Sequence, residues 1–316
     1  MTNIWNFIAE KLKDNHSLYL MVNIESYGSS PGKKGFKMAV SSDGSINGSI
    51  GGGVMERNLA EKSRQLLKTK KRTTFLLEQD HHPKAGKEGS GMICSGKQSV
   101  AFFQLDVKHL ATIQEIITSI EQNIPGVLRI SSDHLLFDKG TILTTENNQI
   151  QTGEQWKFTE QLGLPDHLYI FGAGHVGLAL SQIFSILDFQ VTIFDNRQGL
   201  NTFEENIFAD HKKIIDYQKI EKLIPEGENI YVVVMSFTHK NDELIIRQLL
   251  PKKLKYLGMM GSTMKVKTIF DTLQKEGFHQ SQLDKIDAPI GLEIGSETPS
   301  EIAISIAAKI ISVRRD

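Results

Sequence analysis

Cysteine is almost missing from this chain of 316 residues, which contains only Cys94. One cysteine excludes an intrachain disulfide and every zinc or iron–sulfur site that needs several cysteines, and it suits a reducing cytosol. Long apolar runs are missing too: LYLMVNI at 18–24 is too short to span a membrane, and no signal-peptide charge pattern precedes it. We therefore expect a cytoplasmic protein with no membrane partner.

An excess of charge of one sign is also missing. The 36 Lys and Arg residues nearly cancel the 37 Asp and Glu residues, and there is no long basic run of the kind that binds nucleic acid. Nucleic acid is therefore not an expected partner. The composition, 40% hydrophobic and 23% charged, is typical of a globular protein, and the length allows roughly two domains of about 150 residues each.

The first half reads as a mixed α/β domain. An amphipathic helix at 4–14 precedes a strand-like run at 17–28, a loop rich in Pro and Gly, and a hairpin that turns at Asp43-Gly44. The glycines at 51–53 then join this hairpin to a helix at 54–70. Three glycines in a row require either a turn that only glycine can make or a ligand pressed against bare backbone.

Cys94 lies in a loop between two further predicted strands, at 73–79 and 99–107. A helix follows near 109–122. The polar segment at 152–167 has no clear period, so we interpret it as the interdomain linker. The expected domains are residues 1–160 and 161–316.

The second half has the order of a nucleotide-binding βαβ unit. A β-rich run meets Gly172-x-Gly174-x-x-Gly177, a helix follows, and a second strand ends at Asp195. Two later strands are each followed by a helical pattern, and a capping box that starts at Thr298 begins the last helix. Strands that alternate with helices predict a doubly wound, Rossmann-like parallel sheet, so the fold class is α/β.

Four loops should meet at the carboxyl edge of this sheet, because loops and helix N-termini converge there. They are 172–177, 195–197, 236–239 and 258–262. The first offers backbone N–H groups to a phosphate or pyrophosphate. Asp195 would accept hydrogen bonds from a ribose-like diol, and Arg197 leaves room for a second phosphate. In the alternative interpretation, these glycines only permit tight packing of strand and helix, with no nucleotide bound.

Other side chains in these loops have two interpretations each. His239 could orient a ligand or transfer a proton, and it could equally be an ordinary solvated side chain. His175 would stand close to a bound phosphate or be a spectator. Lys265 and Lys267 could attract an anion or belong to a solvated helix face.

A second strand-to-glycine-to-helix junction lies in the first half, at Gly51 to Gly53, with the same capacity to bind an anion. Two such junctions suggest a large ligand that bears phosphate. Glu56 is either a partner of the helix dipole or a hydrogen-bond acceptor for a polar ring. Cys94 is either a small buried apolar side chain or a thiolate that binds a soft metal or carries sulfur.

Several segments carry a resemblance to a known family. In the first half they are ESYGSSPGKKGFKMAV, DGSINGSIGGGVME and GMICSGKQSV. In the second half they are LYIFGAGHVGLAL, VTIFDNR, FTHKNDE, YLGMMGS and APIGLEIGSETPSEIAISIAAKII. Over nearly its whole length the chain resembles the xanthine dehydrogenase accessory protein family (XdhC/CoxI). Two departures concern thiols: Val54 stands where members commonly carry a cysteine, and Cys94-Ser95-Gly96 replaces their usual Cys-Gly-Gly.

The resemblance implies a protein that binds molybdenum cofactor (molybdopterin), assists its sulfuration by a cysteine desulfurase and hands it to a xanthine dehydrogenase-type molybdenum hydroxylase. It implies a maturation factor rather than a catalyst, so no catalytic residue is expected, and a homo-oligomer such as a dimer is expected. Cys94 would touch the metal. The implied cofactor-binding residues are Gly51, Gly52, Gly53, Glu56, Cys94, Gly172, Gly174, His175, Gly177, Asp195, Arg197, His239, Gly261 and Ser262.

Two rival functions stay open at this point. The first is an NAD(P)-dependent oxidoreductase, in which the second domain holds the dinucleotide and His239 is the candidate proton donor. The second is a binding module that senses a nucleotide and regulates a partner. The identity of the client hydroxylase and the pterin or dinucleotide form of the cofactor do not follow from the sequence.

Overall fold

The computed structural model describes residues 2–69, 73–80, 96–143 and 155–315. The chain divides into two compact units, Met1–Leu164 and Pro165–Asp316. The expected α/β class is confirmed in both units. Within the described ranges, no helix is both long and apolar enough to cross a membrane.

A five-stranded antiparallel sheet forms the centre of the N-terminal unit, with strand order β3-β2-β1-β5-β4. The hairpin expected at Asp43-Gly44 is present, with the Gly44 N–H donating to the Ser41 carbonyl at 2.9 Å. The strands are β1 (Leu18–Tyr27), β2 (Lys37–Ser41), β3 (Ile46–Gly48), β4 (Phe75–Asp80) and β5 (Lys97–Leu105).

A second, three-stranded antiparallel sheet has the order β7-β6-β8. Its strands are β6 (Gly126–Ser131), β7 (Leu135–Lys139) and β8 (Lys157–Leu162). The interpretation of 152–167 as a linker was therefore wrong for β8. Phe158 and Leu162 are buried in the core of this unit, and the polar residues between them hide the strand pattern from the sequence.

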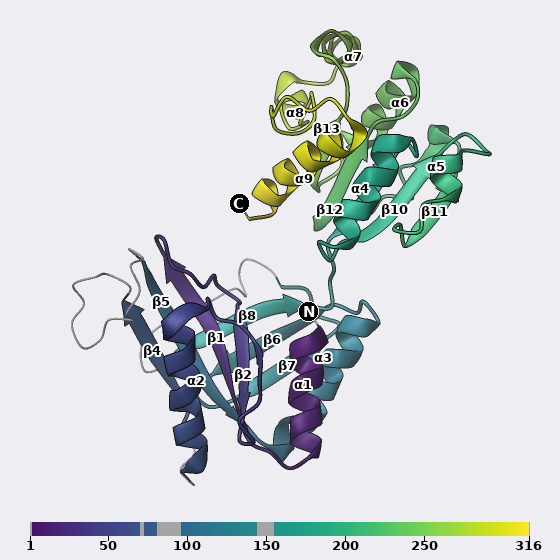
Figure 1. The fold of residues 1–316 in the computed structure, drawn as a ribbon. Helices are drawn as coiled ribbons and strands as arrows, with labels where there is room; N and C mark the ends of the chain where they lie inside the picture. Colours follow the sequence, from purple (N-terminus) through teal and green to yellow (C-terminus); the bar gives the residue numbers. More distant parts are fainter. Residues whose placement is uncertain (1, 70–72, 81–95, 144–154, 316) are drawn as a thin grey trace. The chain divides into compact units, whose positions relative to one another are not determined.

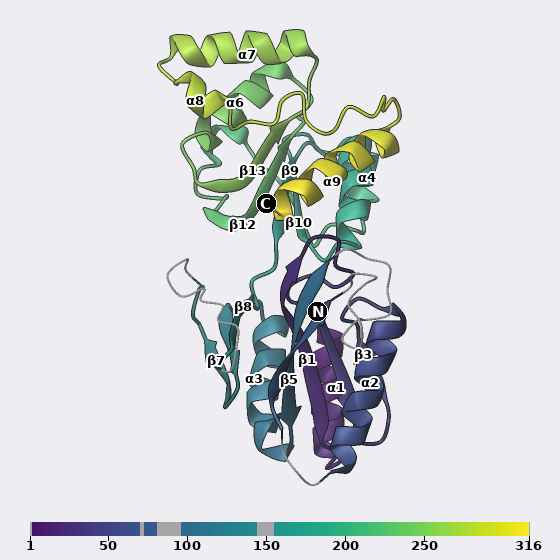
Figure 2. The ribbon, with the colours of Figure 1, turned by 90° about the vertical axis from the view of Figure 1, so that its left-hand side faces the viewer.

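Helices cover both faces of the five-stranded sheet (Figures 1 and 2). On one face Met55 and Leu59 pack against Tyr19 and Met38, as the helical spacing predicts. On the other face the first helix and the second sheet share a core that includes Trp5. The helices are α1 (Thr2–Lys13), α2 (Gly53–Lys68) and α3 (Leu110–Glu121), with the short 3₁₀ turn η2 (Val107–His109) before α3.

All five strands of the C-terminal sheet are parallel, in the order β11-β10-β9-β12-β13. The predicted Rossmann-like, doubly wound sheet is thus confirmed. The strands are β9 (His167–Phe171), β10 (Gln190–Asp195), β11 (His211–Ile214), β12 (Gly227–Val234) and β13 (Leu254–Met259).

Two layers of helices enclose this sheet. Buried side chains of α4 and α9 form one core with it, and those of α6 and α7 form the other. The predicted capping box is present: Glu301 accepts from the Thr298 N–H at 3.0 Å, and Thr298 Oγ1 accepts from the Glu301 N–H at 3.3 Å. The helices are α4 (His175–Ser185), α5 (Asn201–Glu204), α6 (His239–Leu249), α7 (Thr263–Lys275), α8 (Gln280–Leu283) and α9 (Pro299–Arg315), with the 3₁₀ turn η4 (Tyr217–Lys219).

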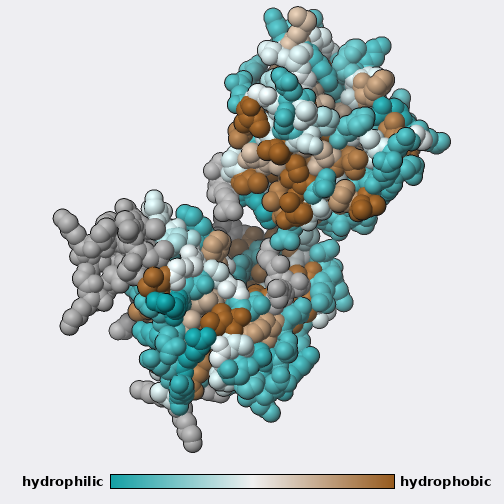
Figure 3. Space-filling model, in the orientation of Figure 1, coloured by the Kyte–Doolittle hydropathy of each residue, from teal (hydrophilic) through white to brown (hydrophobic). Residues whose placement is uncertain are grey.

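Some apolar side chains stay exposed on the C-terminal unit. Figure 3 shows brown, apolar residues gathered on the face of this unit that carries α4 and α9. Ile186, just after α4, and Ile304 in α9 are both exposed. Scattered exposed apolar residues are common on folded proteins. The expected homo-oligomer therefore stays a prediction.

Candidate functional site

The carboxyl ends of four parallel strands lie at one edge of the C-terminal sheet. Phe171 in β9 is opposite both Phe194 in β10 and Val234 in β12, and Val234 is opposite Met259 in β13. The four loops expected at this edge are therefore brought together. The chain reverses its direction of winding between β9 and β12, and a reversal of this kind is where open α/β sheets bind ligands.

The three glycines of the loop after β9 do different things. A Cβ on Gly172 would lie 2.2 Å from the Met235 carbonyl oxygen, and one on Gly177 would lie 2.3 Å from the Gly172 oxygen. Gly172 permits a close approach between the chain segments that follow β9 and β12, and Gly177 permits α4 to pack closely on the loop after β9. A Cβ on Gly174 would meet no atom of the described residues within 4 Å. Two glycines thus serve packing and one faces open space, and the binding of a nucleotide to this loop stays a prediction.

Gly174 is the N-cap of α4 and has φ −75° and ψ −168°, a conformation open to any residue. In the described part of the chain, the N–H groups of Gly174, His175 and Val176 make no hydrogen bond. Free amides at a helix N-terminus carry partial positive charge and bind anions. The backbone around Gly174 therefore has the chemistry that a phosphate needs.

Asp195, at the end of β10, is almost fully buried, with 1% of its surface exposed. Its carboxylate accepts from the Ala173 N–H at 2.8 Å and from three donors of Arg197: the backbone N–H at 3.0 Å, Nε at 2.9 Å and Nη2 at 2.9 Å. Each carboxylate oxygen thus receives two hydrogen bonds from the protein. The predicted contact with a ribose diol would have to displace some of them, and it stays a prediction.

Charge and hydrogen bonding keep Asp195 ionised. Burial alone would raise the pKa of this carboxyl, but the Arg197 side chain and the N–H groups of Ala173 and Arg197 outweigh burial and hold the pKa below its ordinary value. A carboxylate so held fixes the Arg197 guanidinium beside the glycine loop.

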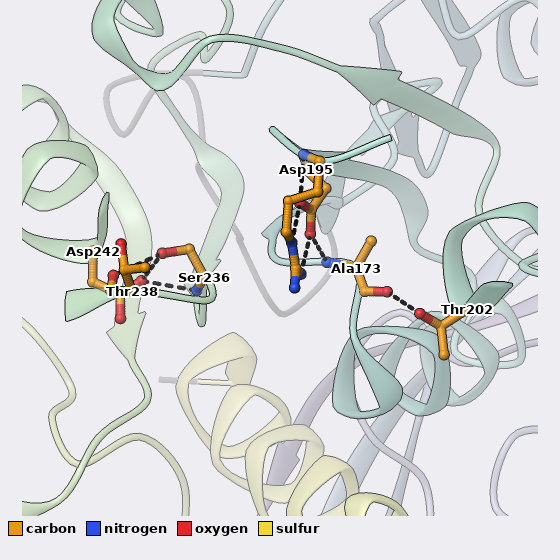
Figure 4. Close-up of polar contacts among 7 residues, drawn as sticks. Ala173, Asp195, Thr202, Ser236, Thr238 and Asp242 are labelled. Atoms are coloured by element: carbon orange, nitrogen blue, oxygen red, sulfur yellow. Dashed lines mark hydrogen bonds and ion pairs between the residues drawn. The ribbon is translucent and has the colours of Figure 1, made fainter. Parts of the chain in front are cut away.

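A second polar group lies on the β12 side of the same edge (Figure 4). The carboxylate of Asp242, which is fully buried, accepts from the Ser236 N–H at 2.8 Å and from Ser236 Oγ at 2.5 Å. Lys265 donates to the other carboxylate oxygen of Asp242 and to the Met260 carbonyl at 3.0 Å. Lys265 therefore neither belongs to a solvated helix face nor is a free cation that could attract an anion. Its ammonium group links Asp242 in α6 to the loop after β13.

The remaining predicted residues at this edge of the sheet make few side-chain contacts. His175 and His239 are exposed first residues of α4 and α6. No hydrogen bond or ion pair involves their side chains within the described residues, so the structure gives them no orienting partner for proton transfer. Ser262 caps α7 by accepting from the Lys265 N–H at 3.3 Å, and Gly261 precedes it.

Phe237 was missed by sequence reasoning. Its side chain is 74% exposed, and the Arg197 guanidinium carbon lies 4.7 Å from its ring centroid. The segment FTHKNDE at 237–243 gave a signal, because an aromatic residue directly after a buried strand belongs to the loop at the carboxyl edge. What the sequence could not show is the contact with an arginine from another loop.

The glycine corner of the N-terminal unit is occupied by the protein itself. Gly51, Gly52 and Gly53 have φ values of 132°, 76° and 70°, which strongly favour glycine. Glu56 Oε2 accepts from Ser49 Oγ at 2.6 Å and from the N–H groups of Ile50 and Gly52, each at 2.9 Å. Glu56 is therefore a hydrogen-bond acceptor for its own backbone.

The same contacts set the charge of Glu56. Burial would raise the pKa of its carboxyl, but the hydrogen bonds from Ser49, Ile50 and Gly52 outweigh burial and hold the pKa below its ordinary value of 4.5. An anion is thus already present at this corner near neutral pH. A contact from the Gly52 N–H to an outside phosphate would require Glu56 to move.

Three segments far apart in the sequence meet beside this corner. A Cβ on Gly32 would lie 2.0 Å from the Ile50 carbonyl oxygen, and one on Gly96 would lie 2.5 Å from the Ser30 nitrogen. The buried Gln98 side chain accepts from Ser30 Oγ at 2.8 Å. The glycines here permit the segments 28–35, 49–53 and 96–98 to touch.

Cys94, the expected metal contact, lies outside the described residues, two positions before Gly96 in the sequence. Within the described ranges, no group of three or more His, Cys, Asp or Glu side chains could hold a metal ion. The metal assignment therefore stays a prediction.

The fold and the glycine loop define a two-unit protein whose C-terminal unit is a Rossmann-type domain. The family model described as the XdhC Rossmann domain matches residues 168–310, and the model described as the XdhC and CoxI family matches residues 12–78. The chain belongs to the XdhC and CoxI family, as the resemblance in its sequence predicts.

Similar proteins agree with this membership. The uncharacterized protein YqeB of Escherichia coli K12 is 26% identical over 314 residues, which are 98% of this chain and 46% of YqeB, so the chain spans about half of that relative. A Bacillus subtilis protein, named as a probable subunit of xanthine dehydrogenase, is 23% identical over 100% of this chain and 98% of its own length. A solved structure called a xanthine dehydrogenase, from Bacillus halodurans, covers 99% of this chain and 95% of its own with a TM-score of 0.73 and 22% identity, and it shows the shared fold.

Proposed function

We propose that this protein is an accessory factor that binds molybdenum cofactor, supports its sulfuration and delivers it to a xanthine dehydrogenase-type molybdenum hydroxylase. The family membership and the name of the Bacillus subtilis relative support an accessory role in xanthine dehydrogenase maturation. A cysteine desulfurase as sulfur donor, a cytoplasmic location and a homo-oligomeric state belong to the same proposal.

The observation that carries the proposal is the opening at Gly174. Within the described residues, the N–H groups of Gly174, His175 and Val176 make no hydrogen bond, and a Cβ on Gly174 would meet nothing within 4 Å. Molybdopterin is a tricyclic pterin with a phosphate tail, so its phosphate fits this cradle. The cofactor would be cargo here, and Gly174, His175 and Val176 would hold its phosphate through their backbone.

The N-terminal unit has a different part in the proposal. Glu56 accepts from the Gly52 N–H and Ser49 Oγ accepts from the Gly51 N–H, so we assign this corner the role of shaping the loops 28–35 and 96–98 beside it. Cys94 lies next to one of these loops in the sequence, and we propose that its thiol contacts the metal or the sulfur.

The experiment that tests the proposal is retention of the cofactor. Protein purified without oxygen is mixed with molybdenum cofactor and desalted, and bound molybdenum and fluorescent oxidised pterin are measured. We expect the wild type to retain both. Gly174→Val should retain neither, because its side chain fills the open space while its backbone conformation and its surroundings tolerate a valine.

Two further variants make the result specific. Ile207→Ala changes an exposed side chain of the same unit and should retain as much molybdenum as the wild type. Cys94→Ser should retain pterin but less molybdenum if the thiol contacts the metal. Loss of both molybdenum and pterin from the wild-type protein would refute the proposal.

The C-terminal sheet keeps one rival function open, an NAD(P)-dependent oxidoreductase. Its glycine loop follows the dinucleotide pattern, and Gly174 has the open position of the second glycine in that pattern. Saturable binding of NADPH or NADH together with turnover of an aldehyde or a hydroxy acid would favour the enzyme. Binding of NADPH or NADH without turnover would not favour the enzyme.

A further inference from the structure

Arg197 and Phe237 join two loops across the end of the central strand. Arg197 follows β10 and Phe237 follows β12, and β9 lies between these strands in the sheet. Their cation–π contact, at 4.7 Å, therefore passes over the point where the glycine loop begins. Asp195 ties the pair to that loop, because it binds both Arg197 and the Ala173 N–H.

The Phe237 ring is exposed, yet its backbone is held on both sides. The preceding Ser236 donates its N–H to Asp242 at 2.8 Å, and the following Thr238 caps α6 by accepting from the Asn241 N–H at 3.3 Å. A ring that is 74% exposed on an anchored backbone is available to stack with a flat ligand.

The Arg197 guanidinium is fixed but not saturated. Its Nε and Nη2 donate to Asp195, whereas its Nη1 makes no hydrogen bond within the described residues. The side chain is 31% exposed. A guanidinium with one edge anchored and another free presents a positioned charge to an anion.

Tyr217 supplies a further polar group near this pair. The residue is buried, and its hydroxyl has no hydrogen-bond partner in the part of the chain that the structure describes. Burial and the charge of Asp195 raise the pKa of this phenol, and the charges of Arg197 and Asp242 also act on it. The Asn196 backbone N–H also acts on this phenol, and the hydroxyl is enclosed by the protein, so Tyr217 underlies the pair and is not part of the surface that a ligand meets.

We propose that Arg197 and Phe237 form a ring-and-anion subsite that selects a planar heterocycle bearing an anionic group over a nucleotide bearing a free ribose diol. The proposal rests on the ligand-binding edge of the proposed function and names its specificity. Each carboxylate oxygen of Asp195 already accepts two hydrogen bonds, from Ala173 and Arg197. Asp195 therefore cannot accept hydrogen bonds from a ribose diol unless some of these bonds break. The choice between the two kinds of ligand therefore depends on the Arg197 guanidinium and the Phe237 ring.

Two fluorescent pterins test the subsite in titrations of the full chain. They are 6-carboxypterin, which is anionic, and 6-hydroxymethylpterin, which is neutral. The wild type should bind the anionic pterin about tenfold more tightly than the neutral one, because a positioned guanidinium strengthens a charge-assisted contact. It should bind NADH more weakly than 6-carboxypterin.

Phe237→Ala should weaken the binding of both pterins by about tenfold, because the stacking partner is lost. Phe237→Tyr should bind like the wild type, and so should the control Ile207→Ala. Arg197→Met should remove the preference for the anionic pterin. Since Arg197→Met leaves the buried Asp195 short of donors, the exposed Phe237 variants decide the matter if it fails to fold.

Equal affinities of wild type and Phe237→Ala, equal affinities for the two pterins, or tighter binding of NADH would each overturn the subsite. The molybdenum retention assay distinguishes a failure of the subsite from a failure of the proposed function. Wild-type retention with no effect of Phe237→Ala on pterin affinity would sink the subsite alone. Discrimination between the pterins by a wild type that retains no molybdenum would sink the proposed function alone.

Discussion

The two glycine-rich junctions of this protein share the order of strand, glycines and helix but treat their backbone amides differently. In the N-terminal unit Glu56, four residues after the N-cap Gly52 of α2, accepts from the N–H groups of Ile50 and Gly52 with its carboxylate. In the C-terminal unit the residue four positions after the N-cap Gly174 of α4 is Leu178, which has no acceptor to offer. The chain thus supplies an anion to the N-cap amide of one junction, and within the described residues it supplies none to that of the other.

The largest expected effect is a difference in stability between substitutions at two glycines of the loop after β9. Gly172→Ala should lower the free energy of unfolding by about 3 kcal/mol or more, because a Cβ would press on the Met235 carbonyl at a φ of 123°. Gly174→Ala should stay within about 0.5 kcal/mol of the wild type. Urea unfolding of both variants measures the difference, and equal stabilities would show that the two glycines are equivalent.

The next largest effect is expected from removing the Glu56 carboxylate from the N-terminal glycine junction. Glu56→Ala should cost about 1–3 kcal/mol of stability, because the N–H groups of Ile50 and Gly52 lose their acceptor. Glu61→Ala, an exposed position on the same helix, is the matched control and should change little. If Glu56 takes the place of an anion, added phosphate should raise the melting temperature of Glu56→Ala more than that of the wild type.

A converse variant should close the open loop. Leu178→Glu places a carboxylate at the position that corresponds to Glu56, where it can reach the amides near Gly174 and repel a phosphate. We expect cofactor binding to weaken about tenfold, which is about 1.4 kcal/mol. Leu178→Gln controls for size without the charge. Undiminished binding by Leu178→Glu would mean that the ligand does not use these amides.

The smallest expected effect is a change in pH dependence. Because the pKa of Glu56 lies below its ordinary 4.5 in the folded protein, the ionised carboxylate stabilises the fold above that pH. This contribution is lost as the pH falls through the folded pKa. The difference in unfolding free energy between the wild type and Glu56→Gln should therefore shrink on acidification. A difference that is constant from neutral pH to about pH 3 would contradict the role of the charge.

Sequence patterns predicted the C-terminal unit well, for a local reason. The strands β9, β12 and β13 each contain a buried apolar run that is followed by a loop and an amphipathic helix, so the alternation of elements can be read directly, whereas the exposed β11 (HKKI) gave no such signal. The carboxyl edge follows from that alternation, and with it the meeting of Gly174, Asp195 and Ser236. In the N-terminal unit β8 was mistaken for linker, because Phe158 and Leu162 are its only buried apolar side chains.

The pairing of polar groups was harder to predict than their location. Asp195 was correctly placed beside the glycine loop, but the sequence could not show that Ala173 and Arg197 already occupy its carboxylate. Lys265 was correctly placed after β13, and its contact with Asp242 depends on a helix from another βα unit. The contacts of Ala173 with Asp195 and of Lys265 with Asp242 join distant parts of the sequence, so no local pattern records them.

The amino-acid sequence by itself determined the family, the α/β class and the positions of both glycine junctions, because glycine spacing, apolar runs and caps act over a few neighbouring residues. Only the tertiary structure decided which N-cap amide is already paired, that of Gly52 with Glu56. That outcome depends on whether a carboxylate reaches the amide, which is a distance between atoms that folding alone brings together.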